Sequence, residues 1–415
     1  MASAERQHSL RPMTGRDPDE PYRTATPLEL LFDLTFVAAF AQAADHAAHL
    51  MAEGHFGSAV VAFVFVTFAV CWAWVNFSWF ASAFDTDDWF CRVMTMVQMV
   101  GVLVLALGVP QVFESVDHGE PLDNGVVVAG YVVMRVALVA QLVRAARQDP
   151  EHRRFALTYA AAIAVAQVGW TAVLFLRLTI VELLPFLVVL YAVELGAPVI
   201  AARRGRFPPW HAHHIAERYG LFVIITLGEV ILGTIAAVAA VVGRVGWSVE
   251  AVLVVVAGTG LAFGIWWTYF VVPTGEILAR HRRRAWVWGY GGIVVFTAVA
   301  ALGAGLHVAA FVAGGEASIG VVQAVLVIAV PVLVTLLAYF SIYAYLVGAV
   351  DPFHVLLVGG GVASLVGAVA LAALGAGLGV CLVLVMLAPA VVVVGYETVG
   401  HRHMSEVLAR VLDGP

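Results

Sequence analysis

Residues 215–242 read IAERYGLFVIITLGEVILGTIAAVAAVV, an apolar stretch long enough to cross a bilayer as a helix. Beyond its first turn the stretch carries one charged residue, Glu229, near its middle. A carboxylate at that depth costs about 2.5 kcal/mol or more, so it normally faces a polar interior. The stretch therefore predicts a helical membrane protein whose bundle encloses ionisable groups.

The composition of the whole chain favours the same class. Hydrophobic residues make up 62% of the 415 residues and charged residues 12%, and the mean hydropathy is +0.94. Soluble proteins carry about 25% charged residues. We expect an all-α polytopic membrane protein with twelve spans, at residues 28–50, 57–81, 90–112, 125–145, 155–176, 179–201, 215–242, 248–272, 286–311, 318–348, 353–376 and 378–396.

The distribution of arginine predicts the orientation of the chain. The sequence contains no lysine, and nineteen of its 22 arginines fall in segments on one side of the predicted spans. Only Arg177 and Arg244 fall on the other side, where residues 111–124 form an acidic loop. Because cytoplasmic segments are enriched in basic residues, we expect both termini in the cytoplasm. Residues 1–27 lack the apolar core of a signal peptide and are expected to form a disordered cytoplasmic tail, with a second tail at residues 397–415.

Paired motifs indicate an internal duplication. Predicted spans one and seven open with acidic motifs, and spans two and eight carry tryptophan-rich motifs that precede an acidic turn and an arginine. The pairs are Glu29–Asp33 with Glu217–Leu221, Trp72–Phe77 with Trp266–Phe270, and Asp85–Arg92 with Thr274–Arg280. An offset of six spans gives both halves one orientation, as in transporters built from parallel repeats. We expect six-helix repeats at residues 28–201 and 215–396 with a cytoplasmic linker at residues 202–214. Recurring interfacial aromatics and cytoplasmic charges are the alternative explanation.

Three motifs carry a resemblance to a known family. They are Thr26–Phe36, Trp72–Trp79 together with Phe84–Asp88, and Glu217–Glu229. In this order they resemble bacterial low temperature requirement protein A, and the resemblance covers most of the chain. It implies a multi-pass protein of the bacterial inner membrane, linked by name to growth in the cold, and it implies no particular reaction. Ala83 and Val271 stand where the family often has an arginine and an acid. An ion pair between these two positions is therefore not expected in this chain.

Seven ionisable residues are candidates for coupling or substrate binding. They are Glu229, Asp33, Glu29, Glu217, His214, Glu194 and Arg135. Burial disfavours the charged form of a carboxyl, so Glu229 is the expected proton-exchanging residue, and Arg135 is expected to pair with one of the acids. Three glycines around Glu229 are expected to let other helices approach closely, namely Gly220, Gly228 and Gly233. For the acids near helix starts, stabilisation by the helix dipole is the alternative role.

Two further groups are weaker candidates. Asp85, Asp87, Asp88 and Arg92 form a polar turn expected on the cytoplasmic side. Asp45, His46 and His49 lie on one stripe at the other end of span one. A wet helix end is favoured over a metal site there, because one helix cannot supply a full ligand set. We expect no metal and no other cofactor, and the three cysteines have no disulfide or zinc-site spacing.

Three classes of function remain open on the sequence. A proton-coupled secondary transporter of a small solute or ion fits the duplication and the buried acids. A membrane protein for cold or stress adaptation, without turnover, would use the acids only as partners of Arg135. An integral-membrane enzyme acting on lipid would place the acids and histidines together at one membrane surface. We expect the protein not to be an enzyme. The arginine clusters flank spans and are expected to contact membrane lipids rather than nucleic acid.

The predicted topology has a direct test. Reporter fusions at either terminus, or in the turns at Asp85–Arg92 and Thr274–Arg284, should report a cytoplasmic location because of the arginine bias. A fusion in the acidic loop 111–124 is the matched control and should report the opposite side. A periplasmic location for either terminus would contradict the topology.

Overall fold

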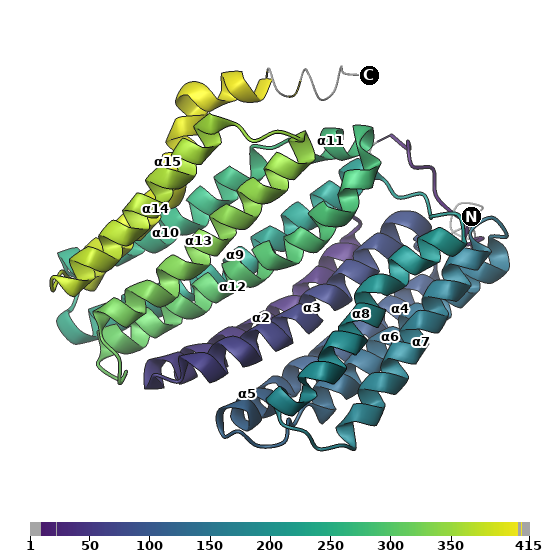
Figure 1. Ribbon diagram of the computed structural model, residues 1–415, viewed down its shortest axis with the longest axis horizontal. Coiled ribbons are helices and arrows are strands. Elements are labelled where there is room, and N and C mark those ends of the chain that lie inside the picture. Colours follow the sequence, from purple (N-terminus) through teal and green to yellow (C-terminus); the bar gives the residue numbers. More distant parts are fainter. Residues whose placement is uncertain (1–9, 22, 406–407, 409–415) are drawn as a thin grey trace, which may run out of the picture. The chain divides into compact units, whose positions relative to one another are not determined.

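The computed structural model describes residues 10–21, 23–405 and 408 (Figure 1). Residues 1–9 of the predicted N-terminal tail lie outside this set, as do Arg6 and Arg410 of the arginine count. The helices are α2 (Pro27–Glu53), α3 (Phe56–Phe84), α4 (Trp89–Leu107), α5 (Val109–Asp117), α6 (Gly125–Gln148), α7 (Arg153–Leu174), α8 (Ile180–Arg204), α9 (Ala212–Val245), α10 (Val249–Phe270), α11 (Thr274–Arg280), η1 (Arg282–Arg284), α12 (Ala285–Gly314), α13 (Val321–Val347), α14 (Pro352–Ala373), α15 (Leu378–Gly395) and η2 (Tyr396–Gly400).

The helical segments confirm the predicted class. Within the described residues, 12 of them are long and apolar enough to cross a membrane, and each overlaps one predicted span. Four of these spans combine more than one element. Helix α4 continues into α5, α10 into α11, η1 into α12 and α15 into η2. The chain is therefore an all-helical polytopic membrane protein.

The chain divides into two compact units. Unit one comprises Met1–Gln42 and Trp72–Ile215, and unit two comprises Ala43–Cys71 and Ala216–Pro415. Helices α2 and α3 thus contribute one part to each unit.

Unit one is held by close contact between helix backbones. In α4 and α6, Gly101 and Gly130 face each other, and a Cβ on Gly130 would lie 2.5 Å from the Gly101 carbonyl oxygen. Helix α6 packs in turn on α7, and α7 on α8. Glycine is needed at this contact because small residues let membrane helices approach without a side chain between them.

Unit two uses the same kind of contact between α9 and α12 and between α12 and α13. Gly233 of α9 meets the Gly303 carbonyl oxygen of α12, and Gly305 of α12 meets the Val327 carbonyl oxygen of α13. Helix α10 packs on α15, where Gly264 lies against Pro389. Helices α12 and α13 run side by side (Figure 1). These contacts fix α9, α12 and α13 around the residues of the candidate site.

The two units share an order of helix contacts. Helices α4, α6, α7 and α8 pack consecutively, as do α12, α13, α14 and α15. The Trp72 indole of α3 bonds Glu194 of α8, and the Trp267 indole of α10 bonds Glu397, which follows α15. This correspondence agrees with the predicted duplication. Consecutive antiparallel helices also pack in this order without duplication, so the repeat stays a prediction.

The described part of the N-terminal segment, residues 10–21 and 23–26, packs on unit one. Met13 is fully buried in a cluster with Phe84 and Leu142. The backbone N–H of Met13 donates to Gln148 Oε1 and that of Gly15 to Asp149 Oδ2, each at 2.7 Å. This differs from the disordered tail that the polar composition predicts. The buried methionine and the hydrogen bonds offset the entropy that is lost when these residues are ordered.

The α4–α6 contact makes a testable prediction. In Gly130→Ala the new methyl group would meet the Leu105 nitrogen and the Gly101 carbonyl, so the helices must separate. We expect a loss of about 1–3 kcal/mol in stability, as for other overpacked cores. Thermal unfolding in detergent measures it. Gly125→Ala in the same helix is the control, because its methyl group meets no atom within 4 Å. Equal unfolding temperatures for the two variants would contradict the contact.

Candidate functional site

Glu29 lies at the start of α2 in a buried polar group of unit one. Its carboxylate accepts from the Thr26 N–H at 2.7 Å, and the Thr26 hydroxyl accepts from the Glu29 N–H at 3.3 Å, which forms a capping box. His214 Nε2 lies 3.2 Å from Glu29 Oε1, and both side chains are buried. Arg23 Nη2 lies 4.0 Å from the same oxygen. Glu29 therefore caps its helix and also joins a histidine and an arginine.

Asp33 lies one turn further along α2 and is 1% exposed. The Trp74 indole N–H donates to Asp33 Oδ1 at 2.7 Å. The acidic motif of span one and the tryptophan motif of span two, both part of the family resemblance, thus meet through a hydrogen bond. An indole donor stabilises a carboxylate without supplying a positive charge.

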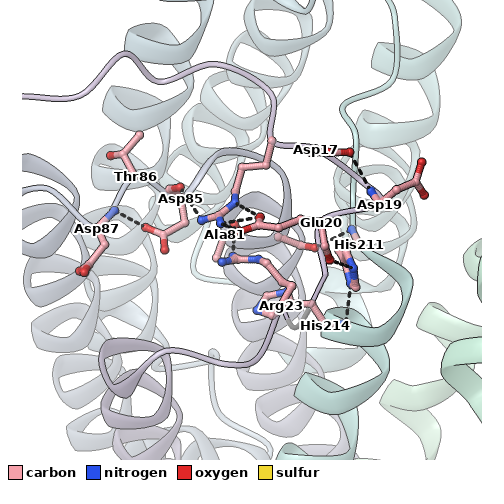
Figure 2. Close-up of polar contacts among 12 residues, drawn as sticks. Asp17, Asp19, Glu20, Arg23, Ala81, Asp85, Thr86, Asp87, His211 and His214 are labelled. Carbon is pink, nitrogen blue, oxygen red and sulfur yellow. Dashed lines mark hydrogen bonds and ion pairs between the residues drawn. The ribbon is translucent and has the colours of Figure 1, made fainter.

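The N-terminal segment covers this group with a second set of bonds (Figure 2). His211 Nε2 contacts the Glu20 carbonyl oxygen at 2.9 Å, and His211 Nδ1 accepts from the His214 N–H at 3.1 Å. Burial lowers the pKa of His211, which favours the neutral ring that both bonds require, protonated on Nε2. Arg23 Nη2 donates to the Ala81 carbonyl at 3.1 Å. His211 therefore caps α9 and holds the N-terminal segment.

The acidic turn between α3 and α4 contains one buried and one exposed ion pair. Arg144 of α6 pairs with Asp88, whose side chain is 0% exposed, and Arg144 Nη2 also donates to the Arg11 carbonyl at 2.7 Å. Burial alone would raise the pKa of Asp88, but the bonds from Arg144 and from backbone N–H groups hold that pKa well below its usual range. Arg92 pairs at 2.9 Å with Asp87, and both side chains are exposed. Burial raises the pKa of the remaining acid, Asp85.

Asp149, Glu151 and His152 bring potential metal-ligating atoms within 4.8 Å of one another. These atoms already have protein partners. Asp149 Oδ2 accepts from the Gly15 N–H and contacts His152 Nδ1, each at 2.7 Å, and Glu151 pairs with Arg206. The cluster holds the N-terminal segment, and its geometry gives no reason to place a metal there.

Arg135 and Glu194 form a fully buried ion pair inside unit one. Arg135 Nη2 lies 3.3 Å from Glu194 Oε2, and the side chains are 2% and 3% exposed. Trp72 Nε1 donates to Glu194 at 2.9 Å and Gln167 Nε2 donates at 3.0 Å, while the Arg135 guanidinium lies over the Tyr131 ring. Glu194 is therefore the acid that pairs with Arg135.

Glu229 of unit two has a different environment. Its side chain is buried, at 2% exposed, against Gly303 of α12. Within the described residues it has no hydrogen-bond or ion-pair partner, and the charge that acts on it is the Asp45 carboxylate. The cost of burying an uncompensated carboxylate favours a group that takes up a proton.

A column of titratable residues extends from Glu229 along α12 and α2. Glu229 of α9 lies against Gly303 of α12. One turn further along α9 and α12, Gly233 of α9 lies against His307 of α12. His307 interacts electrostatically with Asp45 and His49. His49 Nδ1 lies 3.6 Å from Asp45 Oδ1, and both side chains are 56% exposed. Exposure thus increases stepwise from Glu229 through His307 to Asp45 and His49.

The remaining predicted residues lie apart from this column or differ from expectation. Glu217 is exposed at the start of α9, and His46 is half-buried beside Asp45. Gly220 and Gly233 allow close approach, by Phe270 and Gly303 respectively. Gly228 does not, because no atom lies within 4 Å of a Cβ at that position. The expectation for Gly228 was wrong, since this face of α9 is open.

Several residues of these groups were not singled out by the sequence. They are His211, Glu20, Arg144, Asp149, His152 and His307. His307 is the one with a usable signal, because it is an isolated histidine within an apolar span. The others lie in short polar connections or at helix ends, where charge is ordinary in any membrane protein.

The two ion pairs of the acidic turn give a matched comparison. Arg144→Gln leaves Asp88 buried without its cation, and we expect a loss of about 3–5 kcal/mol in stability. Arg92→Gln removes the exposed pair and should cost less than about 1 kcal/mol. Thermal unfolding of both variants in detergent checks the difference. Equal losses would show that Asp88 is solvated in the folded protein.

Comparisons with known proteins support the resemblance. The family model for the bacterial low temperature requirement A protein (LtrA) matches residues 24–389. An uncharacterized protein of Rhizobium meliloti (strain 1021) is 30% identical over 209 residues, so the match spans about half of each protein, 49% of this chain and 49% of the relative. No solved structure matches. Because the family model covers nearly the whole length, the chain belongs to the bacterial low temperature requirement A (LtrA) family.

Proposed function

We propose that the chain is a proton-coupled secondary transporter of the bacterial cytoplasmic membrane, with both termini in the cytoplasm and Glu229 as the coupling residue. The single observation that carries the proposal is the isolation of Glu229. It is a deeply buried carboxyl with no cation or hydrogen-bond donor among the described residues. A buried acid without a fixed partner can exchange a proton at a lower cost than one locked in an ion pair.

The column of Asp45, His49 and His307 supports this role by offering a route for the proton. The route leads from Glu229 toward the C-terminal ends of α2 and α12, where the His49 and Phe311 rings lie 4.7 Å apart. Under the predicted topology these ends face away from the cytoplasm. Histidine and aspartate chains of this kind are typical of proton pathways in pumps and transporters.

The buried ion pair of Arg135 and Glu194 favours a structural role for unit one. Each of these charges has its counter-charge, and Glu194 also has two hydrogen-bond donors. Such a group fixes the geometry of a bundle. We therefore propose that unit one contributes structure and that the coupling chemistry lies in unit two. The predicted duplication, if present, would then have given one copy the charge pair and the other copy the exchangeable acid.

Glu229→Gln tests the proposal because it keeps the shape of the side chain and removes its proton exchange. In a strain lacking this gene, the variant should reach wild-type abundance in the membrane and fail to restore growth in the cold or ion tolerance. Glu53→Gln at the exposed end of α2 is the control and should restore growth fully. Full rescue by Glu229→Gln at normal abundance would remove the main support for proton coupling.

A spectroscopic measurement separates proton binding from transport. Purified wild-type protein at neutral pH should show the infrared band of a protonated carboxylic acid, and Glu229→Gln should lose that band. A band that is equally strong in both proteins would show that Glu229 does not hold the proton.

A further inference from the structure

A large apolar groove runs along α3, α12 and α13 in unit two. Its volume is about 670 Å³, whereas the two cavities beside Tyr339 measure about 20 and 30 Å³. Seventeen residues line the groove, and all but Thr297 and Gln323 have apolar or proline side chains. A volume in this range is typical of pockets that hold a small molecule.

The length of the groove matches one leaflet of a bilayer. Its lining runs from Gln323 to Val334 in α13 and from Phe56 to Phe68 in α3. At 1.5 Å per residue each stretch is about 17 Å long. Half of a hydrocarbon core of roughly 30 Å is about 15 Å. The groove therefore begins near one membrane surface, at the first turn of α13, and ends near the bilayer centre.

The lining fits a flexible chain better than a second helix. Helices associate in membranes through small residues that permit close backbone contact. The groove contains no glycine, and its exposed wall carries branched residues such as Val60, Val64 and Val330, each about half exposed. A flexible hydrocarbon chain can fill the spaces between such side chains, which a helix surface would leave empty.

The open end of the groove has a polar group that suits a lipid headgroup. Gln323 lies in the first turn of α13, where its Oε1 accepts from the Gly320 N–H at 3.2 Å. Its side-chain amide N–H groups have no partner among the described residues. They are donors for an ester or phosphate oxygen at the membrane surface.

We propose that this groove binds one acyl chain of a membrane phospholipid, with the headgroup beside Gln323. The site is separate from the Glu229 column and doesn't depend on the transport proposal. The bound chain fills the space between α3, α12 and α13 and belongs to the leaflet at the N-terminal end of α13.

Photo-crosslinking tests the site on the unaltered protein. The chain is reconstituted in vesicles that contain phosphatidylethanolamine with a diazirine in its acyl chain, and the labelled peptides are mapped. We expect labelling concentrated in residues 56–68, 293–301 and 323–334 and resistant to dilution with unlabelled lipid that removes labelling elsewhere. Even labelling of all lipid-facing helices, α14 included, would overturn the proposal.

Groove-filling variants give an independent measurement. Val64→Trp and Val330→Trp place a large ring in the groove, and each should lose the phospholipid that native mass spectrometry finds on the wild type after detergent exchange. Val366→Trp, on an exposed position of α14, is the control and should keep that lipid. Retention of phospholipid by the two groove variants would overturn the proposal. A wild-type dimer that Val330→Trp dissociates, with no bound lipid, would also overturn it by making a second copy of the chain the occupant.

Discussion

The ion pair between Arg135 and Glu194 places two opposite charges in the apolar interior of unit one, 3.3 Å apart. Charges at such depth persist only when each has its partner, and removing one of them costs about 3–5 kcal/mol. The surrounding side chains satisfy this constraint. Trp72 and Gln167 donate hydrogen bonds to Glu194, and the Tyr131 ring lies against the Arg135 guanidinium. Glu29 with Arg23, and Asp88 with Arg144, follow the same rule near the helix ends. The buried charges of unit one are therefore held in ion pairs that connect its helices.

Glu229 is informative because it departs from that rule. The chain contains the means to pair a buried acid, as Glu194 shows, yet Glu229 lies against the glycine Gly303, and the charge that acts on it is another carboxylate, Asp45. Charge neutrality must then come from a mobile species, and the smallest such species is a proton. Gly303 contributes to this environment. A side chain at that position would collide with the Cβ and the backbone of Glu229.

The sequence predicted the twelve spans because each needs about 20 apolar residues, a signal that is local and strong. It also identified the buried acids, since an ionisable residue within such a span is conspicuous. It could not assign their partners, because Arg135 and Glu194 are 59 residues apart and only the packing of α6 against its neighbours brings them together. The N-terminal segment differs from its predicted disorder for a related reason. Its composition is polar, and the contacts that order it come from Gln148, Asp149 and His211, far along the chain.

The N-terminal segment also imposes an order on the biogenesis of unit one. It is synthesised before every residue that holds it, and its contact with His211 spans 191 residues from Glu20. Loop closure over such a distance is entropically unfavourable until other contacts have shortened the loop. The segment therefore lacks most of its binding surface while the first spans enter the membrane, since only its contacts with the end of α3 are then available. It docks fully after α4, α6 and the start of α9 are in place. Docking of these residues marks the completion of unit one, because they are made before the residues that hold them and reach their native contacts after them.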